Sequence, residues 1–75
     1  MGGGAYMPLA MAQRGKVETI KKINGKDEVK RFLESLGFVV GSEVMVVSEL
    51  SGNMIVNIKD SRVAISKAMA TRIFV

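Results

Sequence analysis

Apolar residues recur every three to four positions along the middle of the chain and then give way to a glycine. Val29, Phe32, Leu33 and Leu36 lie at i, i+3, i+4 and i+7, a spacing that places them on one face of a helix. The residue after the last of them is Gly37, and a helix commonly ends at a left-handed residue that only glycine adopts without strain. The pattern therefore predicts a helix that ends near Leu36.

The residues after this helix predict a tight exit into a strand. Phe38 stands where a residue beyond a glycine stop can fold back onto Leu33. Val40-Gly41 suits a turn in which glycine takes the position of positive φ. We therefore interpret Gly37 and Gly41 as turn-forming residues that shape the backbone.

The segment before the helix predicts a first strand and a helix start. Residues 16–23 alternate in part between apolar and polar side chains, and Ile20 breaks the alternation, which predicts a strand with a kink near Ile20. Asn24-Gly25 ends the strand. Asp27 is predicted to cap the helix, and Glu28 places negative charge near the helix N-terminus.

Short β-branched or alternating segments fill the rest of the chain. Strands are predicted over residues 44–50, 54–58, 63–65 and 73–75, with short loops over 51–53 and 59–62. Alternation places Met54 inward and Asn57 outward. Ser66 is predicted to cap one helical turn through Met69.

These elements predict a mainly β protein. The expected fold is a small SH3-like barrel of five strands, with one covering α-helix between strands 1 and 2 and a helical turn before the last strand. Residues 1–6, with three consecutive glycines, are predicted to be a disordered leader or a cloning remnant, and residues 7–75 form the domain. Met7–Ala12 is apolar without a clear period and is expected to lie extended across the barrel.

Composition argues against several kinds of chemistry. The 75 residues include no cysteine and no histidine, which removes disulfides, thiolate metal sites and the commonest general base. No pair of carboxylates or serines has a spacing that implies cooperation, and no glycine run matches a phosphate-binding loop. We therefore expect neither an enzyme nor a bound cofactor. Neither a secretory signal nor a membrane-length apolar run is evident, which favours a cytoplasmic location.

The net charge of +4 raises an alternative function. Basic residues gather early in the chain, interrupted by acidic ones: Arg14, Lys16, Lys21, Lys22 and Lys26, with Glu18, Asp27 and Glu28 among them. A basic small barrel that binds nucleic acid is thus one hypothesis. We favour a mixed, solvated surface, because the few aromatic residues that could stack on bases lie outside the basic runs.

Six methionines are many for so short a chain. Thioether side chains can bind soft metals, but they more commonly fill irregular cores and adaptable protein-binding surfaces. Met54 is expected in the core, whereas Met7, Met11 and Met69 are expected to border a docking surface. The scattered carboxylates are expected to be solvated.

The order of these motifs resembles a known family. Residues 31–38, Arg-Phe-Leu-Glu-Ser-Leu-Gly-Phe, followed by Gly41 and Val44, are similar to the central motif of ferrous iron transport protein A (FeoA). That family carries Arg-Leu-x-x-Leu-Gly-Leu, then Pro-Gly and a valine-rich strand. The opening Met7-Pro8-Leu9 and the tail from Asn53 to Val75 also fit, so the resemblance covers about residues 7–75. Phe32 stands where leucine is frequent, and Val40 replaces the usual proline.

The resemblance implies an SH3-like cytoplasmic accessory of bacterial ferrous iron uptake. Its implied partner is ferrous iron transport protein B, a large membrane transporter, which it would contact near the cytoplasmic GTP-binding domain. Because the sequence contains no recognisable group of catalytic residues, we expect the protein to act by binding its partner. The residues expected to touch the partner are Leu9, Met11, Arg31 and Phe32. The alternative for each is that it fills the core or, for Arg31, that it is a solvated surface charge.

Overall fold

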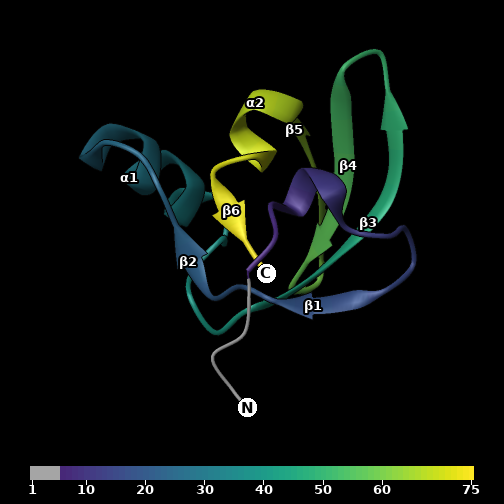
Figure 1. Cartoon of the computed structure of the whole chain (residues 1–75), viewed down its shortest axis with the longest axis horizontal. Coiled ribbons are helices and arrows are strands. Elements are labelled where there is room, and N and C mark those ends of the chain that lie inside the picture. The colour runs from purple at the N-terminus through teal and green to yellow at the C-terminus, as the bar shows by residue number, and fades with distance from the viewer. Residues whose placement is uncertain (1–5) are drawn as a thin grey trace.

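The computed structural model describes residues 6–75, so the prediction for residues 1–6 falls outside the described residues except at Tyr6. Its elements follow one another along the chain as shown in Figure 1. They are the 3-10 turn η1 (Leu9–Met11), β1 (Val17–Thr19), β2 (Lys22–Ile23), α1 (Asp27–Ser35), β3 (Glu43–Leu50), β4 (Asn53–Ile58), β5 (Ser61–Ser66), α2 (Lys67–Ala70) and β6 (Ile73–Phe74).

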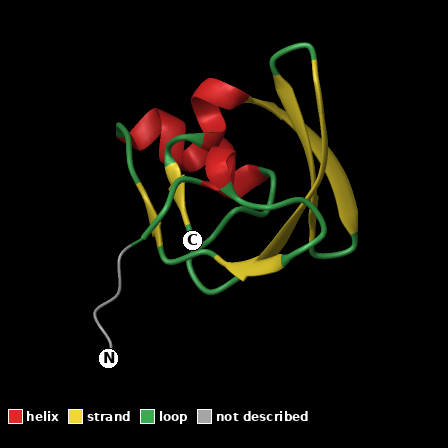
Figure 2. Cartoon of the chain, turned by 45° about the vertical axis from the view of Figure 1, so that its right-hand side comes forward, coloured by secondary structure: helices red, strands yellow, loops and turns green. Residues whose placement is uncertain are grey.

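The strands form two antiparallel sheets. The larger has the order β1-β3-β4-β5, and the smaller pairs β2 with β6. Two-residue turns, Ser51-Gly52 and Lys59-Asp60, join β3, β4 and β5 into a meander. The helices gather on one side of the curved larger sheet (Figure 2). The predicted mainly β class and the positions of both helices are confirmed, whereas the expected first strand is two short strands.

Ile20 separates those two strands, at the predicted kink. Its N–H donates to the carbonyl of Ser42 (2.9 Å), and its own carbonyl accepts from the N–H of Gly41 (2.8 Å). The next residue, Lys21, donates instead to the carbonyl of Phe74 (2.8 Å). The chain thus leaves the larger sheet and enters the smaller one at a corner whose backbone groups remain hydrogen-bonded.

The segment Met7–Ala12 was expected to be extended, and this is wrong over Leu9–Met11, which form a 3-10 turn. Pro8 precedes the turn with φ −62°, and its carbonyl accepts from the N–H of Met11 (2.9 Å). Burial explains the turn, because it lowers the apolar Leu9 side chain fully into the core. Met7 is extended, and its N–H and carbonyl both bond to Val75 (3.1 and 2.9 Å).

The end of α1 has the glycine stop that the sequence predicts. The N–H of Gly37 donates to Glu34 (2.9 Å) and that of Phe38 donates to Leu33 (2.9 Å), which are the two bonds of a Schellman motif. Gly37 has φ +105°. A second turn follows, in which Ser42 N–H donates to the Val39 carbonyl (3.0 Å) and Gly41 has φ +95°.

The start of α1 differs from the prediction. Lys26 is the N-cap, and Asp27 is the first helical residue. A lysine side chain has no acceptor to offer the free N–H groups, and no side-chain cap bond forms. Asp27 and Glu28 still place two negative charges in the first turn, beside the positive end of the helix dipole. The other predicted cap is confirmed, since Ser66 Oγ accepts from Met69 N–H (3.2 Å) at the start of α2.

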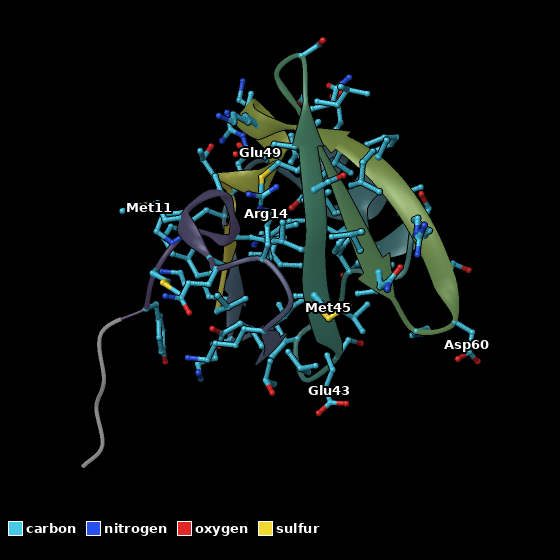
Figure 3. All side chains as sticks on the ribbon, turned by 90° about the vertical axis from the view of Figure 1, so that its right-hand side faces the viewer. Met11, Arg14, Glu43, Met45, Glu49 and Asp60 are labelled. Carbon is cyan, nitrogen blue, oxygen red and sulfur yellow. The ribbon has the colours of Figure 1, made fainter. Side chains whose placement is uncertain are left out.

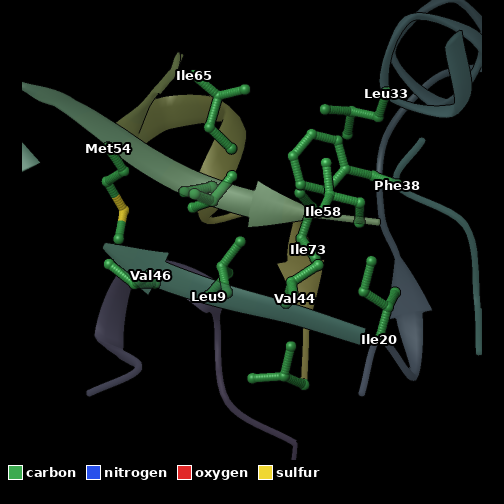
Figure 4. Close-up of a cluster of buried hydrophobic side chains, with 13 residues drawn as sticks. Leu9, Ile20, Leu33, Phe38, Val44, Val46, Met54, Ile58, Ile65 and Ile73 are labelled. Atoms are coloured by element: carbon green, nitrogen blue, oxygen red, sulfur yellow. The ribbon is translucent and has the colours of Figure 1, made fainter. Parts of the chain in front are cut away.

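The core lies between the inner face of the larger sheet and the helices (Figure 4). β4 contributes every second side chain, starting at Met54, as the alternation predicts. Leu33 and Phe38 are both fully buried there. The fully buried or nearly buried residues are Leu9, Ile20, Leu33, Phe38, Val44, Val46, Met54, Val56, Ile58, Ile65, Ala70, Ile73 and Val75.

Candidate interaction surface

Leu9 and Met11 lie on the same 3-10 turn but have opposite environments. Leu9 is fully buried in the core, whereas the Met11 side chain is 71% exposed. A partner cannot reach Leu9 in this conformation, so its expected role in partner contact has no surface to act from. Leu9 instead anchors the turn that presents Met11.

Arg31 and Phe32 lie on the solvent side of α1. Phe32 is 49% exposed, because it sits at the margin of the apolar stripe whose centre, Leu33, is buried. The Phe32 carbonyl also accepts a bond from Ser35 Oγ (2.6 Å) in the last turn of the helix. The two side chains are consecutive on α1, and both are exposed.

The structure does not bring Met11 and Phe32 together. η1 packs against α2, and η1 and α1 lie on different sides of β6 (Figure 1). The four residues expected to touch the partner therefore divide into a buried anchor, an exposed methionine and a helix face. This separation depends on pairing between the two ends of the chain, which no local pattern indicates.

A row of side chains crosses the outer face of the larger sheet, which Figure 3 views from the front. Strand register places four residues in one row across β1, β3, β4 and β5: Val17, Met45, Asn57 and Arg62. Val17 is 55% exposed and Met45 is partly exposed. At the far end of the row, Arg62 Nε donates to Asn57 Oδ1 (3.3 Å). The row thus runs from an apolar end to a polar end.

A shallow hollow opens at the apolar end of this row. It offers about 200 Å³ and is lined by Val17, Glu43, Val44, Met45, Asn57 and Lys59. Sites for small organic ligands usually span about 300–1,000 Å³. The hollow therefore fits one protruding side chain of a partner better than a whole small molecule. The sequence did not reveal this hollow, because Val17 and Met45 are apolar residues of the kind that usually fill a core. Only the strand register shows that they lie on the outer face of the sheet.

Charge on the surface is mixed in sign. Within residues 6–75, ion pairs join Lys16 to Glu18 (3.6 Å) and Lys67 to Glu49 (2.8 Å). Glu18 is the unusual member, because its side chain is only 15% exposed and Oε2 has no hydrogen-bond partner. Lys16 lies outside hydrogen-bonding range of that oxygen and supplies charge alone.

Two absences concern residues 6–75. No three His, Cys, Asp or Glu side chains in this part of the chain gather closely enough to hold a metal ion. None of its helices has the length and apolar character needed to cross a membrane.

Comparisons with known proteins agree with one another. The family model of the FeoA domain matches residues 7–75. A candidate Fe(2+) transport protein A of Methanocaldococcus jannaschii is 34% identical over 68 residues, which covers 91% of this chain and 83% of that protein.

Solved structures show the same fold. The crystal structure of an iron uptake regulatory protein, FeoA, superposes with a TM-score of 0.85 at 26% identity and 93% coverage of both chains. FeoA of Stenotrophomonas maltophilia, solved with zinc and described as a prokaryotic SH3 domain protein, gives a TM-score of 0.77 at 25% identity, with 89% of this chain and 86% of that chain covered. The chain belongs to the FeoA family, with its SH3-like fold.

Proposed function

We propose that this protein is a small cytoplasmic accessory of ferrous iron uptake. It acts by direct contact with the GTP-binding transporter, ferrous iron transport protein B, at the transporter's cytoplasmic domain. It is not itself an enzyme and needs no cofactor. The observation that carries the proposal is family membership over residues 7–75, supported by a relative that bears the name of an Fe(2+) transport protein.

The surface of the protein supports action by contact. Arginine and aromatic residues dominate the binding energy of protein interfaces, and α1 presents Arg31 beside the half-exposed Phe32. We propose this pair as the principal contact. Met11 is a second contact on a separate side, and its unbranched thioether can adapt to the shape of a partner.

A binding experiment tests the proposal. The purified protein is titrated into the transporter's cytoplasmic domain without nucleotide, with GDP and with a non-hydrolysable GTP analogue, and the heat of binding is measured. We expect saturable binding in at least one nucleotide state. Phe32→Ser should weaken it at least fivefold, because truncating a central aromatic contact costs more than about 1 kcal/mol. Arg31→Glu should weaken it as well.

Leu50→Ser is the matched control. Leu50 is 68% exposed at the β3–β4 turn, so this variant also replaces an exposed apolar side chain but should bind normally. Absence of binding in every nucleotide state, together with normal ferrous iron uptake in cells that lack the protein, would refute the proposal.

The nucleic-acid hypothesis has its own readout. Electrostatic binding to single-stranded RNA weakens steeply with salt, so the fluorescence anisotropy of a labelled RNA is followed from low to physiological ionic strength. We expect the signal to be lost. Micromolar binding that persists at physiological salt would favour the nucleic-acid class instead.

A further inference from the structure

One long edge of the larger sheet has no neighbouring strand among residues 6–75. β5 pairs with β4 along its whole length, from Ser61 to Ser66, without a bulge. Within residues 6–75 no other strand pairs with it. Figure 3 shows β5 at the margin of the sheet, beside the turn that carries Asp60.

The backbone groups on this edge follow from the hairpin geometry. The two-residue turn between β4 and β5 makes the flanking residues Ile58 and Ser61 a hydrogen-bonded pair. Bonding then alternates along an antiparallel ladder. The N–H and carbonyl groups of Arg62 and Ala64, and the N–H of Ser66, therefore point away from β4 toward the open edge.

This edge lacks the devices that usually block strand pairing. The opposite edge strand has them, since β1 is only three residues long and carries Glu18. β5 has neither proline nor bulge. Its one charged side chain, Arg62, donates to Asn57 Oδ1 (3.3 Å), so it is drawn across the sheet face and away from the edge.

The chain turns away from the open edge at the C-terminal end of β5. At the C-terminal end, Lys67 N–H donates to the carbonyl of Gly52 (3.0 Å). Gly52 lies in the β3–β4 turn, on the opposite side from the open edge, so the chain turns inward into α2. Ala64, at the centre of the strand, is exposed.

The sequence of β5 is complementary to itself about Ala64. In an antiparallel pairing of two copies centred there, Arg62 faces Ser66 of the other copy and Val63 faces Ile65. No like charges oppose each other, and an apolar pair lies on each side of the two-fold axis. We propose that the open edge of β5 pairs with the same edge of a second copy of this chain, giving a symmetric dimer with one continuous eight-stranded sheet.

The pairing satisfies the free backbone groups. The two Ala64 residues exchange N–H to carbonyl bonds, and each Ser66 N–H donates to the carbonyl of Arg62 across the axis, about four inter-chain bonds in all. The Ser66 carbonyl is left to accept the first helical bond of α2. Arg31, Phe32 and Met45 take no part in these inter-chain backbone bonds, so the strand pairing does not depend on the proposed transporter contact.

The interface is small, so the dimer is weak. Stable complexes commonly bury about 1,200–2,000 Å², more than a single strand pair provides. Each copy carries +4, and added salt screens the resulting repulsion. Dimerisation should therefore strengthen, rather than weaken, as salt rises.

Sedimentation equilibrium of the full 75-residue chain tests the proposal, from about 0.05 to 2 mM protein in low and in about 0.5 M salt. We expect the mass to move from 8.1 kDa toward twice that value as concentration rises. Ala64→Lys places two lysines directly opposite each other, and it should weaken the dimer at least tenfold. Leu50→Lys adds the same charge at the exposed β3–β4 turn and should weaken it much less.

A third variant should strengthen the dimer. Ser66→Asp keeps a good cap for α2 and places a carboxylate opposite Arg62 of the other copy, twice per dimer. We expect about three- to tenfold tighter association, since opposite-charge cross-strand pairs contribute up to about 1 kcal/mol each.

Several results would overturn the proposal. One is a mass of 8.1 kDa at every concentration and salt level. Others are equal loss of the dimer in Ala64→Lys and Leu50→Lys, or weaker association in Ser66→Asp. Circular dichroism shows whether each variant is folded, and Ala64 is exposed, so its replacement should leave the fold intact.

Discussion

The β3–β5 meander and the region where the chain ends meet are built from contacts of very different sequence separation. In the meander, strands are joined by two-residue turns and pair with their immediate neighbours. In the other region, β2 pairs with β6 across 50 to 52 positions, and Met7 pairs with Val75 across 68. The first can form early from local contacts, whereas the second must wait for a long loop to close. Ile58 in the meander and Ile73 in β6 belong to one core, and we expect them to enter it at different stages of folding.

The largest expected effect is on equilibrium stability. Ile58 in the meander and Ile73 in β6 are both buried, with 1% and 0% exposure. Ile58→Ala and Ile73→Ala should each lower the free energy of unfolding by about 2–5 kcal/mol, because each leaves a cavity. Urea denaturation followed by circular dichroism measures the loss. A cost below about 1 kcal/mol for Ile73→Ala alone would mean that the terminal region contributes little to the cooperative core.

The glycine joints between the two regions come next. Gly37 and Gly41 have φ of +105° and +95°. A Cβ at Gly37 would make only ordinary contact with Ile58 at 3.5 Å, and one at Gly41 would meet nothing within 4 Å. Backbone strain is therefore the main penalty, and Gly37→Ala and Gly41→Ala should each cost about 1–2 kcal/mol. Urea midpoints equal to that of the parent chain would show that the joints tolerate other conformations.

A smaller effect is expected at the cap between β5 and α2. Ser66→Ala removes the acceptor for Met69 N–H and should cost about 1 kcal/mol. Ser66→Asp restores an acceptor and should recover most of the loss. Thermal unfolding at a concentration too low for association measures both variants. If Ser66→Asp were as unstable as Ser66→Ala, the capping bond would not be the source of the loss.

The smallest expected effect is kinetic and separates the regions directly. Ile58→Val and Ile73→Val should each cost about 0.5–1.5 kcal/mol. We expect the change at Ile58 mainly to slow folding and the change at Ile73 mainly to speed unfolding, because only the local contacts are formed early. Stopped-flow refolding and unfolding in urea measures both rates. The opposite pattern would show that the chain ends pair before the meander does.

The difference between local and long-range contacts also explains which features could be predicted from the sequence. The glycine exit of α1, the inward face of β4 and the Ser66 cap were all predicted from residues within a few positions of each other. Whether Leu9 fills the core or touches a partner could not be decided from the sequence, nor could the separation of Met11 from Phe32 be predicted, because both depend on the distant β6 segment. At the start of α1 the error was local: Asp27 was expected as the cap, but the helix starts immediately after Lys26, so the carboxylates interact with the helix dipole instead.

The paired hydrogen bonds between Met7 and Val75 also have a practical consequence for rearranging the gene. They hold the two ends of the described domain side by side, so a short glycine linker could join them. New ends could then be opened at the exposed Ser51-Gly52 turn, giving a circularly permuted chain with the same contacts. In such a chain β2 and β6 would be separated by far fewer residues than before, and the closure of the longest loop would be transferred to the pairing of β3 with β4.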